Sequence, residues 1–490
     1  MILSVFSSAI LYYLAFPNVL NSDGFWFFGW VFALPLFFVL DRQGPRARFL
    51  TGFVFGCLAH ALLLQWLTPV HFFGYLIFVL VLSLQPAVFS LGFIKIKNRL
   101  LDCVYVPALW AATEWLRTLA LGGFCWSAGY SQGFHPELIQ AASWTGPYGV
   151  SFVLVVVNYC LYRTMTDPAK RLEYWLGGLG VFCAVWVGGI EVMRGAVKLF
   201  SQTAARVDTV AVIQPNIDFV RKWDREYFDE NVLKHVALTI AAMKSSAVDL
   251  VVWPETAFPD DLVTDAKWFP YLSELAAGIE ADFLIGAVGR LNGRDANSAV
   301  WIGHDGKLKG MYHKQFLIPF WERAVFKKML PRLNKHDLTA GKELGIFFPT
   351  LTGGKKYGVA ICSEGSYPRL FRQLRRAQAR AAVVLLNDGW FAEEAALKMH
   401  AQNEIFRAVE TRLNVVRASN TGLTSVITPW GQLVRSPGLA PNTEGFGIFK
   451  ILPLQKDSLY VQFGDLFAAG CAAFVIMALG LSYFKKNNEK

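Results

Sequence analysis

The sequence contains no pair of cysteines with the spacing CxxC, although seven cysteines are spread over its 490 residues. This absence excludes the common thiolate zinc sites and dithiol redox sites. Most of the cysteines lie inside apolar runs, where cysteine usually serves as a small hydrophobic residue. His400, on a segment with helical spacing, also has no second histidine or cysteine at a metal-ligand spacing. We therefore expect neither a bound metal nor another cofactor.

Charged residues are scarce, at 17% of the chain, whereas hydrophobic residues make up 54% and the mean hydropathy is +0.35. These values exceed those of most soluble domains and predict that part of the chain lies in lipid. The net charge is +10, but no run of Lys and Arg is long enough to follow the phosphates of a nucleic acid. Basic cytoplasmic loops and attraction to anionic lipid head groups explain the charge better than nucleic-acid binding does.

Apolar segments follow one another in the first part of the chain, and several approach the ~20 residues that cross a bilayer. We predict eight spans, near 4–20, 25–40, 50–68, 73–94, 103–120, 147–162, 173–192 and 466–484. The first segment has no basic n-region and no clear cleavage site, so we interpret it as a retained span and not as a signal peptide. The sequence thus divides into a membrane domain at 1–195, an α/β domain at 196–460, and a last span with its tail at 461–490.

Lysine and arginine are absent from alternate loops between these spans, near 21–24, 69–72 and 121–146. They follow the second, fourth, sixth and eighth spans, as Arg42, Arg46, Arg48, Lys95, Lys97, Arg99, Arg163, Lys170, Arg171, Lys485, Lys486 and Lys490. Because basic loops stay in the cytoplasm, both termini should be cytoplasmic and the α/β domain should lie on the outer face. For a bacterium this means a multi-pass protein of the inner membrane with its α/β domain in the periplasm.

Short β-rich runs alternate with helical segments between residues 207 and 450. We predict strands at 207–214, 248–255, 282–289, 357–364, 381–388 and 413–419, and helices at 226–246 and 394–411. Continuous Val, Ile and Leu runs indicate a sheet that is covered on both faces, and the alternation with helices indicates an α/β layered domain.

Cys362 is the one cysteine in this α/β region, and it lies where the apolar run "YGVAIC" ends. A lone cysteine is most often a small core residue. In an oxidising compartment, however, structural cysteines usually pair, and Cys362 has no partner in its own domain. A bridge to Cys125, in an outer loop, is an alternative that we do not favour. An unpaired thiol in that compartment is more often retained for chemistry.

Glu255, Lys314 and Cys362 each end a predicted strand or follow one closely. Ligands of open α/β sheets bind at the carboxyl ends of the strands, so these three side chains are expected to lie together. A carboxylate within hydrogen-bond reach can take the proton of a thiol, and an ammonium group can stabilise first the thiolate and then an oxyanion. The set suits acyl transfer through a thioester, and it contains no histidine of the papain kind.

Four motifs resemble the nitrilase superfamily, whose triad is Glu, Lys and Cys in that chain order. They are "WPET" at 253–256, "YHKQFLIPFWE" at 312–322, "CSE" at 362–364 and "NDGWF" at 387–391. With the predicted spans, "EWLR" at 114–117 and "GYSQG" at 129–133, the whole chain resembles the apolipoprotein N-acyltransferase family. The resemblance implies an αββα nitrilase-like sandwich, inserted after seven spans and before the eighth.

The resemblance also implies a reaction. Cys362 would attack an ester carbonyl of a phospholipid, phosphatidylethanolamine at its sn-1 position, and hold the fatty acyl chain as a thioester. The α-amine of an S-diacylglyceryl cysteine at the N-terminus of an apolipoprotein would then take the acyl chain. Glu255 would be the base and Lys314 the oxyanion stabiliser. The expected partners are thus a phospholipid donor and a diacylated apolipoprotein, and we expect a monomer.

Three further residues match positions that support the site in this family. Glu322 follows Lys314 by eight residues, Glu364 lies in the turn of the nucleophile, and Trp223 lies in "RKWD" after the first strand. The resemblance implies that these side chains support the triad.

The sequence departs from the family pattern at two positions. Ser363 stands where the family usually has an aromatic residue after the nucleophile, and Trp321 stands where it usually has glycine. Both positions bear on the acyl-chain pocket and on a loop over it. Together with Trp390 and Phe391 of "NDGWF", they are our candidates for contact with lipid, although core packing explains such aromatic residues equally well.

Two other functions remain open from the residues alone. A membrane-anchored amidase would use the same thioester with water as acceptor, but it would not need so many spans. A transporter with an outer domain would carry ionisable residues in several spans, and they are sparse here. Glu114 and Arg117, three residues apart in the fifth span, favour structural pairing, with contact to a lipid head group as the alternative.

Overall fold

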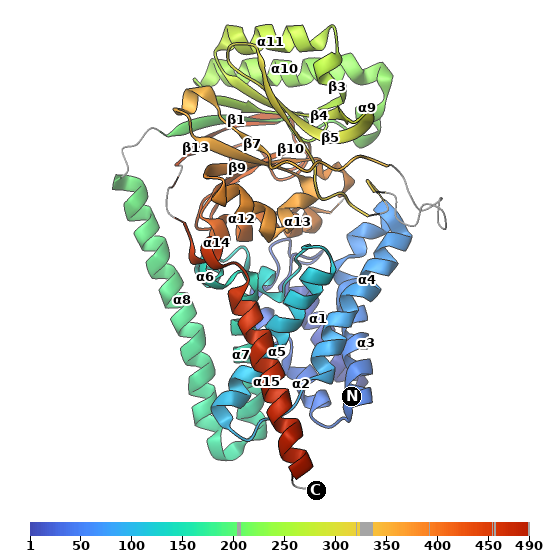
Figure 1. Ribbon diagram of the computed structural model, residues 1–490, viewed down its shortest axis with the longest axis vertical. Coiled ribbons are helices and arrows are strands. Elements are labelled where there is room, and N and C mark those ends of the chain that lie inside the picture. The colour runs from blue at the N-terminus through green and yellow to red at the C-terminus, as the bar shows by residue number, and fades with distance from the viewer. Residues whose placement is uncertain are drawn as a thin grey trace. The chain divides into compact units, whose positions relative to one another are not determined.

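The computed structural model describes residues 1–202, 207–319, 321–323, 337–391, 393–452, 454 and 457–488. The chain forms two compact units, one of Met1–Lys198 with Ser458–Lys490 and one of Leu199–Asp457. The first unit is helical and the second combines sheets with helices (Figure 1).

Helices of very different lengths build the first unit. They are α1 (Ile2–Ala15), α2 (Leu34–Leu40), α3 (Pro45–Leu63), α4 (Thr68–Leu91), α5 (Arg99–Ala120), α6 (Ala142–Thr145), α7 (Pro147–Thr166), α8 (Arg171–Gln202), α14 (Leu459–Phe463) and α15 (Leu466–Asn488). Local sequence explains several of the helix starts. Pro45 and Pro147 occupy the first turn of α3 and α7, where the missing N–H costs no hydrogen bond. The Asn98 side chain caps α5 by accepting from the Leu101 N–H at 3.1 Å.

Four stretches of helix are long and apolar enough to cross a bilayer, within the described residues: Pro45–Leu63, Gln65–Leu91, Pro147–Thr166 and Pro168–Lys198. Three shorter apolar stretches, Ile2–Ala15, Trp26–Leu40 and Leu466–Ser482, coincide with the first, second and eighth predicted spans. The fifth predicted span forms α5, which is long but carries several charged residues. The structure therefore has a helix near each predicted span, and the number that cross the membrane stays a prediction.

Small residues let α3 and α4 approach closely. A Cβ atom on Gly52 would lie 2.3 Å from the carbonyl oxygen of Pro86, and one on Gly56 would lie 2.6 Å from the Pro86 ring. Two glycines four residues apart on one helix face give the packing expected for helices in lipid, where close backbone contact stabilises the pair.

Glu114 and Arg117, inside the helical unit, have hydrogen-bond partners that the sequence does not predict. Glu114 accepts hydrogen bonds from the Trp110 indole at 2.8 Å, the Ala128 N–H at 2.8 Å and the Ser127 hydroxyl at 3.1 Å. Arg117 donates instead to Gln85, at 3.4 Å. Within the described residues Glu114 and Arg117 form no ion pair with each other, so the expected pairing is wrong. The buried carboxylate of Glu114 is instead stabilised by neutral hydrogen-bond donors of the same unit.

Two sheets form the α/β unit. The first has the order β13-β1-β2-β4-β5-β6, with β3 paired to β4, and the second has the order β12-β11-β10-β9-β8-β7. The strands of the first sheet are β1 (Asp208–Gln214), β2 (Leu250–Val252), β3 (Phe258–Asp261), β4 (Asp282–Leu291), β5 (Arg294–Ile302), β6 (Leu308–His313) and β13 (Gly445–Ile451). Those of the second are β7 (Ile346–Phe347), β8 (Lys356–Ile361), β9 (Ala379–Leu386), β10 (Asn414–Ser419), β11 (Ser425–Ile427) and β12 (Leu433–Val434).

The sheets pack face to face and helices cover their outer faces, as the resemblance implies (Figure 1). Side chains alternate along β1: Val210 and Val212 enter the core between the sheets, whereas Ala211 and Ile213 face the helices. The helices α10 (Phe228–Ser245) and α11 (Trp268–Ile279) cover the first sheet, next to the short α9 (Phe219–Trp223). The second sheet is covered by α12 (Pro368–Arg376) and α13 (Glu394–Thr411). The unit is thus an αββα sandwich.

The parallel strands of both sheets coincide with the six runs predicted from apolar composition. β1, β2 and β4 pair in parallel in one sheet, and β8, β9 and β10 pair in parallel in the other. Such strands are buried on both faces, which explains why hydrophobicity alone finds them.

Candidate active site

Glu255 lies just after β2, in a turn that a neighbouring strand approaches closely. Thr256, which follows it, has a φ of +46°, a left-handed backbone that non-glycine residues adopt at a cost of about 1–2 kcal/mol. On β4, a Cβ atom at Gly286 would lie 2.1 Å from the Pro254 carbonyl oxygen. Glycine is therefore required at 286 for the turn of Glu255 to pack onto the sheet.

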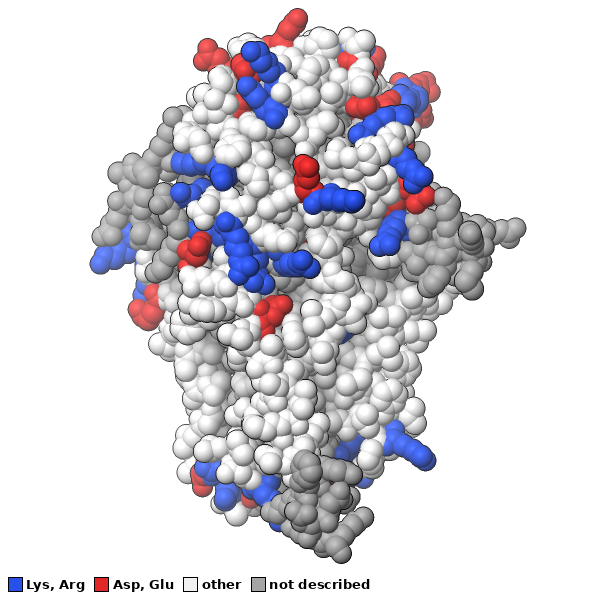
Figure 2. Space-filling view, in the orientation of Figure 1, with Lys and Arg blue, Asp and Glu red and all other residues white. Residues whose placement is uncertain are grey.

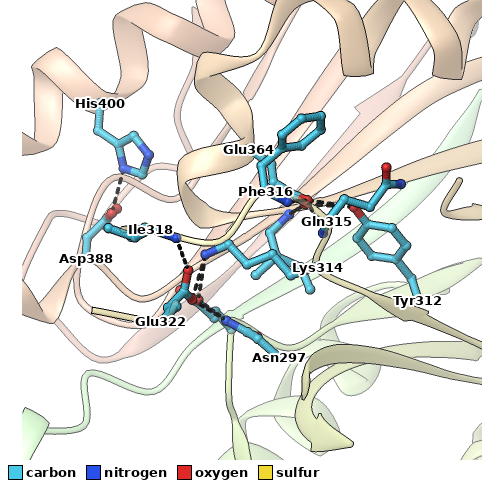
Figure 3. Close-up of polar contacts among 12 residues, drawn as sticks. Asn297, Tyr312, Lys314, Gln315, Phe316, Ile318, Glu322, Glu364, Asp388 and His400 are labelled. Atoms are coloured by element: carbon cyan, nitrogen blue, oxygen red, sulfur yellow. Dashed lines mark hydrogen bonds and ion pairs between the residues drawn. The ribbon is translucent and has the colours of Figure 1, made fainter. Parts of the chain in front are cut away.

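Lys314 follows β6 directly and is completely buried. Its backbone is held on both sides, by a bond from its N–H to the Asn297 carbonyl and one from the Gly341 N–H to its own carbonyl, each 2.8 Å long. Its Nζ lies 2.9 Å from Oε1 of Glu322 (Figure 3). The same Nζ lies 4.0 Å from Oε1 of Glu255. The structure thus brings together three of the predicted site residues, Glu255, Lys314 and Glu322.

Cys362 is the first residue after β8 and opens the short helical turn Cys362–Ser366. Its φ is +52°, so this turn stores backbone strain at the thiol itself. Cys362 is 9% exposed and lies in the core between the two sheets.

Glu364 ties the turn of Cys362 to the segment of Lys314. One oxygen accepts from the Ile361 N–H at 2.7 Å, and the other accepts from the Gln315 N–H at 2.7 Å and the Phe316 N–H at 3.2 Å. The hydroxyl of Tyr312 adds a bond of 2.9 Å (Figure 3). Because β6 and β8 belong to different sheets, this buried carboxylate fixes the turn of Cys362 relative to the segment of Lys314. Its position fits the supporting role that the sequence suggests.

The thiol and the two charged groups influence one another. Burial raises the pKa of Cys362 well above its ordinary value and Glu255 raises it further, whereas Lys314 lowers it. The resting thiol is therefore protonated. Burial lowers the pKa of Lys314, but the carboxylates of Glu322 and Glu255, with Cys362, more than offset this, so the pKa is raised and the side chain stays an ammonium ion.

The two carboxylate oxygens of Glu255 differ in their hydrogen bonding among the described residues. Its Oε1 accepts from Nδ2 of Asn297 at 2.7 Å, while Oε2 is buried and has no hydrogen-bond partner among the described residues. Asn297 also donates to Glu322 Oε1 at 3.2 Å, so it aligns both carboxylates. The sequence does not point to Asn297. This residue lies on the antiparallel strand β5, and no recognisable motif surrounds it.

Trp223 and its neighbour Lys222 differ sharply in burial. Trp223 is 47% exposed at the end of α9, whereas Lys222 is 3% exposed and donates from Nζ to the carbonyl oxygen of Glu255 at 2.6 Å. The sequence singles out the tryptophan of "RKWD", but the lysine is the residue that touches the turn of Glu255. The sequence does contain one indication of Lys222: it lies one helical turn after Asp218, the residue that caps α9.

The four candidates for lipid contact lie partly buried around this site. The Trp321 and Trp390 rings meet edge to face with centroids 4.5 Å apart, and Phe219 of α9 lies 3.8 Å from Trp390. Phe391 packs at 5.8 Å against the ring of His400 on α13. Ser363 is half-buried, and no partner of its hydroxyl is found among the described residues. Trp390 thus joins loops that are far apart in the sequence.

A buried charge cluster lies behind the turn of Cys362. His400 donates from Nδ1 to Asp388 at 3.0 Å, as Figure 3 shows, and Arg417 contacts both Asp388 and Glu404. Burial raises the pKa of Asp388, but the hydrogen bond from His400 and the charge of Arg417 bring it below its ordinary value. A Cβ atom on Gly365 would lie 2.4 Å from Glu404, so the cluster packs directly on the turn of Cys362. His400 thus takes part in a buried hydrogen-bond network, and no group of metal-ligating side chains is found in the described residues.

Comparison with known proteins covers almost the whole chain. Residues 8–160 match the family model described as "Apolipoprotein N-acyltransferase N-terminal domain", and residues 209–451 match "Carbon-nitrogen hydrolase". The chain is 31% identical to an apolipoprotein N-acyltransferase of Geobacter metallireducens, over 98% of this chain and 95% of the relative. It is 26% identical to apolipoprotein N-acyltransferase 1 of Treponema denticola, over 96% of this chain and 94% of the relative.

Solved structures match about half of this chain. Nit3 of Saccharomyces cerevisiae, a member of the nitrilase superfamily, is 18% identical, with a TM-score of 0.40 over 51% of this chain and 91% of that one. An amidase from Nesterenkonia sp. AN1 is 15% identical, with a TM-score of 0.40 over 53% of this chain and 94% of that one.

Proposed function

Since this chain belongs to the apolipoprotein N-acyltransferase family, we propose that it moves a fatty acyl chain from a membrane phospholipid to the N-terminal amine of a lipoprotein. The observation that carries the proposal is the likeness to a named N-acyltransferase along nearly the full length, including the helical unit. The donor is phosphatidylethanolamine, used at its sn-1 ester. The acceptor is the α-amine of an S-diacylglyceryl cysteine.

In the first half-reaction Cys362 is the nucleophile and Glu255 is the base. The free Oε2 of Glu255 accepts the thiol proton while sulfur bonds to the ester carbonyl carbon. Negative charge moves to the carbonyl oxygen, where the ammonium of Lys314 stabilises it. The bond from carbon to the glycerol oxygen then breaks. Glu255 returns its proton to that oxygen, so a lysophospholipid leaves and the acyl chain stays on sulfur.

The second half-reaction reverses these proton movements. The acceptor amine attacks the thioester carbon and Glu255 takes a proton from its nitrogen. The carbon–sulfur bond breaks, and the proton on Glu255 restores the thiol. Glu322 keeps Lys314 charged and in place, with its Oε1 2.9 Å from Nζ. Glu364 holds the nucleophile turn on the segment of Lys314.

We place the helical unit in the bacterial inner membrane as eight spans, with both termini cytoplasmic and the α/β unit in the periplasm. Figure 2 shows a broad band without charged side chains on the helical unit and a group of Lys and Arg at its lower end. Ion pairs join the three basic loops to one another: Lys95 to Asp41, Arg99 to Glu173 and Arg163 to Asp102. These loops therefore share one end of the unit, as the positive-inside rule requires of cytoplasmic loops.

The lipid-contact residues then form the wall of an acyl pocket. Trp321 and Trp390 lie edge to face, and Ser363 follows the nucleophile directly. Burying a methylene group of an acyl chain against such rings stabilises the bound state by about 0.8 kcal/mol. A monomer suffices for the mechanism, because the whole triad comes from one chain.

A transfer assay separates this function from that of an amidase. The purified protein in detergent micelles receives phosphatidylethanolamine, labelled in its sn-1 acyl chain, and a synthetic S-diacylglyceryl-cysteinyl peptide. We expect the label to appear as an amide on the peptide, with one lysophospholipid released for each amide formed. Chromatography and mass spectrometry of the peptide measure this result.

Two outcomes would contradict the proposal. Label recovered as free fatty acid while the peptide stays unmodified would make water the acceptor. Label that stays on the phospholipid, in a protein that is folded by thermal melting, would remove the donor assignment. An N-acetylated peptide of the same sequence is the matched control and should receive no label.

A further inference from the structure

Lys222 carries a buried positive charge that the mechanism above does not use. It lies on α9, only five residues long, between Arg221 and Trp223, both of which are exposed. Burial of an ammonium group costs several kcal/mol of desolvation free energy. A lysine on so short a helix would avoid this cost if its side chain were exposed to water. The chain nevertheless turns this side chain inward, to 3% exposure.

Among the described residues, this ammonium makes one hydrogen bond, and it goes to the turn that carries Glu255. Its Nζ donates to the carbonyl oxygen of Glu255 at 2.6 Å, and within the described residues no carboxylate lies within ion-pair distance of it. That carbonyl precedes Thr256, whose φ of +46° marks the strained point of the turn. A charge-assisted bond at this point opposes relaxation of the strain.

Three titratable groups face Lys222 from the elements around it. Burial lowers its pKa to about 7, while the negative charge of Glu255 opposes that shift and Cys362 lies nearby. His235 faces it from α10, and burial, with the charge of Lys222 contributing, lowers the pKa of His235 to about 3. His235 is therefore neutral, with Nδ1 bonded to the Asn231 carbonyl at 2.8 Å. Lys222 thus combines a buried hydrogen bond to the turn of Glu255 with a pKa that burial lowers to about 7.

We propose that Lys222 is a positioning residue: its buried ammonium holds the backbone of Glu255 so that the free carboxylate oxygen faces the thiol of Cys362. Asn297 fixes the same carboxylate from the other side, at Oε1. One hydrogen bond thus holds the backbone of Glu255 and another holds its Oε1. Together they restrict the rotation of the carboxylate, with Oε2 left to accept the thiol proton. The proposal rests on the proposed function, because the base is needed only if Cys362 is the nucleophile.

Lys222→Met tests the proposal, since methionine keeps an unbranched side chain of similar length and removes the ammonium. The rate constant for acylation of Cys362 by phosphatidylethanolamine is followed by rapid mixing and mass spectrometry between pH 5.5 and 9. Loss of a hydrogen bond from a charged donor should slow acylation about 10- to 100-fold. The binding constant for the phospholipid should not change, because Lys222 acts through Glu255.

The pH profile separates positioning from general destabilisation. Above pH 7 the wild-type ammonium loses its proton and its bond to the Glu255 carbonyl becomes a neutral one, so acylation should slow by roughly 3- to 10-fold. Lys222→Gln carries a neutral donor at every pH and should lack this step. Arg221→Met, on the same short helix but exposed, is the matched control and should keep both the rate and the step.

Each outcome decides between the proposals. Acylation of Lys222→Met at the wild-type rate, with the wild-type pH profile, would overturn the positioning role and leave the proposed function intact. A wild-type protein that never acylates Cys362 would instead overturn the proposed function. If Lys222→Met does not fold, Lys222→Gln decides in the same assay. Retention of the step near pH 7 in that variant would assign the step to another group and overturn the proposal.

Discussion

Replacement of Cys362 by alanine is expected to abolish acyl transfer completely while the protein still folds and enters the membrane. Alanine is smaller than cysteine and meets the same left-handed backbone at φ +52°, so the fold should be kept, but the atom that forms the thioester is removed. The expected loss exceeds the assay range, because no other cysteine belongs to the α/β unit. Cys362→Ser should be equally inactive, since a serine hydroxyl is a much weaker acid than a thiol.

The transfer assay with labelled phosphatidylethanolamine measures this loss. Cys183→Ala is the matched control, because Cys183 is an exposed cysteine on α8 of the helical unit, and it should keep full activity. Thermal melting and the yield in membranes show whether each variant folds. Transfer by Cys362→Ala at the wild-type rate would remove the nucleophile assignment, and with it every role derived from the thioester.

Replacement of Glu255 by glutamine is expected to slow the acylation of Cys362 by about 10²- to 10⁴-fold, the effect of a lost general base. Glutamine has the same shape and can still accept from Asn297 through its carbonyl oxygen, so the turn should keep its structure. The ion pair of Lys314 with Glu322, with its N–O distance of 2.9 Å, is not touched by the change. The loss is therefore one of proton transfer.

Single-turnover acylation, without acceptor peptide, measures the effect of Glu255→Gln. Because burial holds the pKa of the Cys362 thiol well above its ordinary value, spontaneous ionisation does not replace the base at neutral pH. Glu274→Gln, an exposed change on α11, should acylate at the wild-type rate. A near-normal rate for Glu255→Gln would assign the proton to another group and leave Glu255 a charge-balancing partner of Lys314.

The apolar pattern of the sequence predicts the centre of the sandwich and misses its edges. The parallel strands β1, β2, β4, β8, β9 and β10 are near-continuous apolar runs, because side chains pack on both of their faces. The antiparallel strands carry weaker signals. β7 and β12 are two residues long, and β5 begins with the exposed residues Arg294 and Asp295. Their place in the sheet is decided by pairing partners that lie far away in the sequence.

In the candidate site, too, some residues can be identified from the sequence and others cannot. Glu255, Lys314 and Cys362 could be singled out because each follows a strand and belongs to a motif. Asn297 and Lys222 could not, since an amide on a strand and a lysine in a polar segment look like ordinary surface residues. Only the fold shows that both are buried against Glu255. Burial of isolated polar groups is a tertiary property that local sequence does not encode.

In the helical unit, the sequence predicts the helices but not the contacts between their polar side chains. Apolar length predicts where helices lie, but not which polar groups inside them meet. Glu114 and Arg117 are correctly spaced for a contact on one helix face, yet Glu114 turns to the Ala128 N–H and Arg117 to Gln85. Both partners are brought close by the packing of the helices, so they depend on the tertiary fold and not on spacing along one helix.

The most direct test of the account is the mass of the peptide that contains Cys362 after incubation with phosphatidylethanolamine alone. Without an acceptor the acyl chain has nowhere to go, so the account predicts that this peptide gains the mass of one fatty acyl group. Hydroxylamine should remove the added mass, as it does for thioesters, and the Cys362→Ala peptide should never gain it. An unmodified Cys362 peptide, in a preparation that still transfers acyl chains to the acceptor, would contradict the central claim.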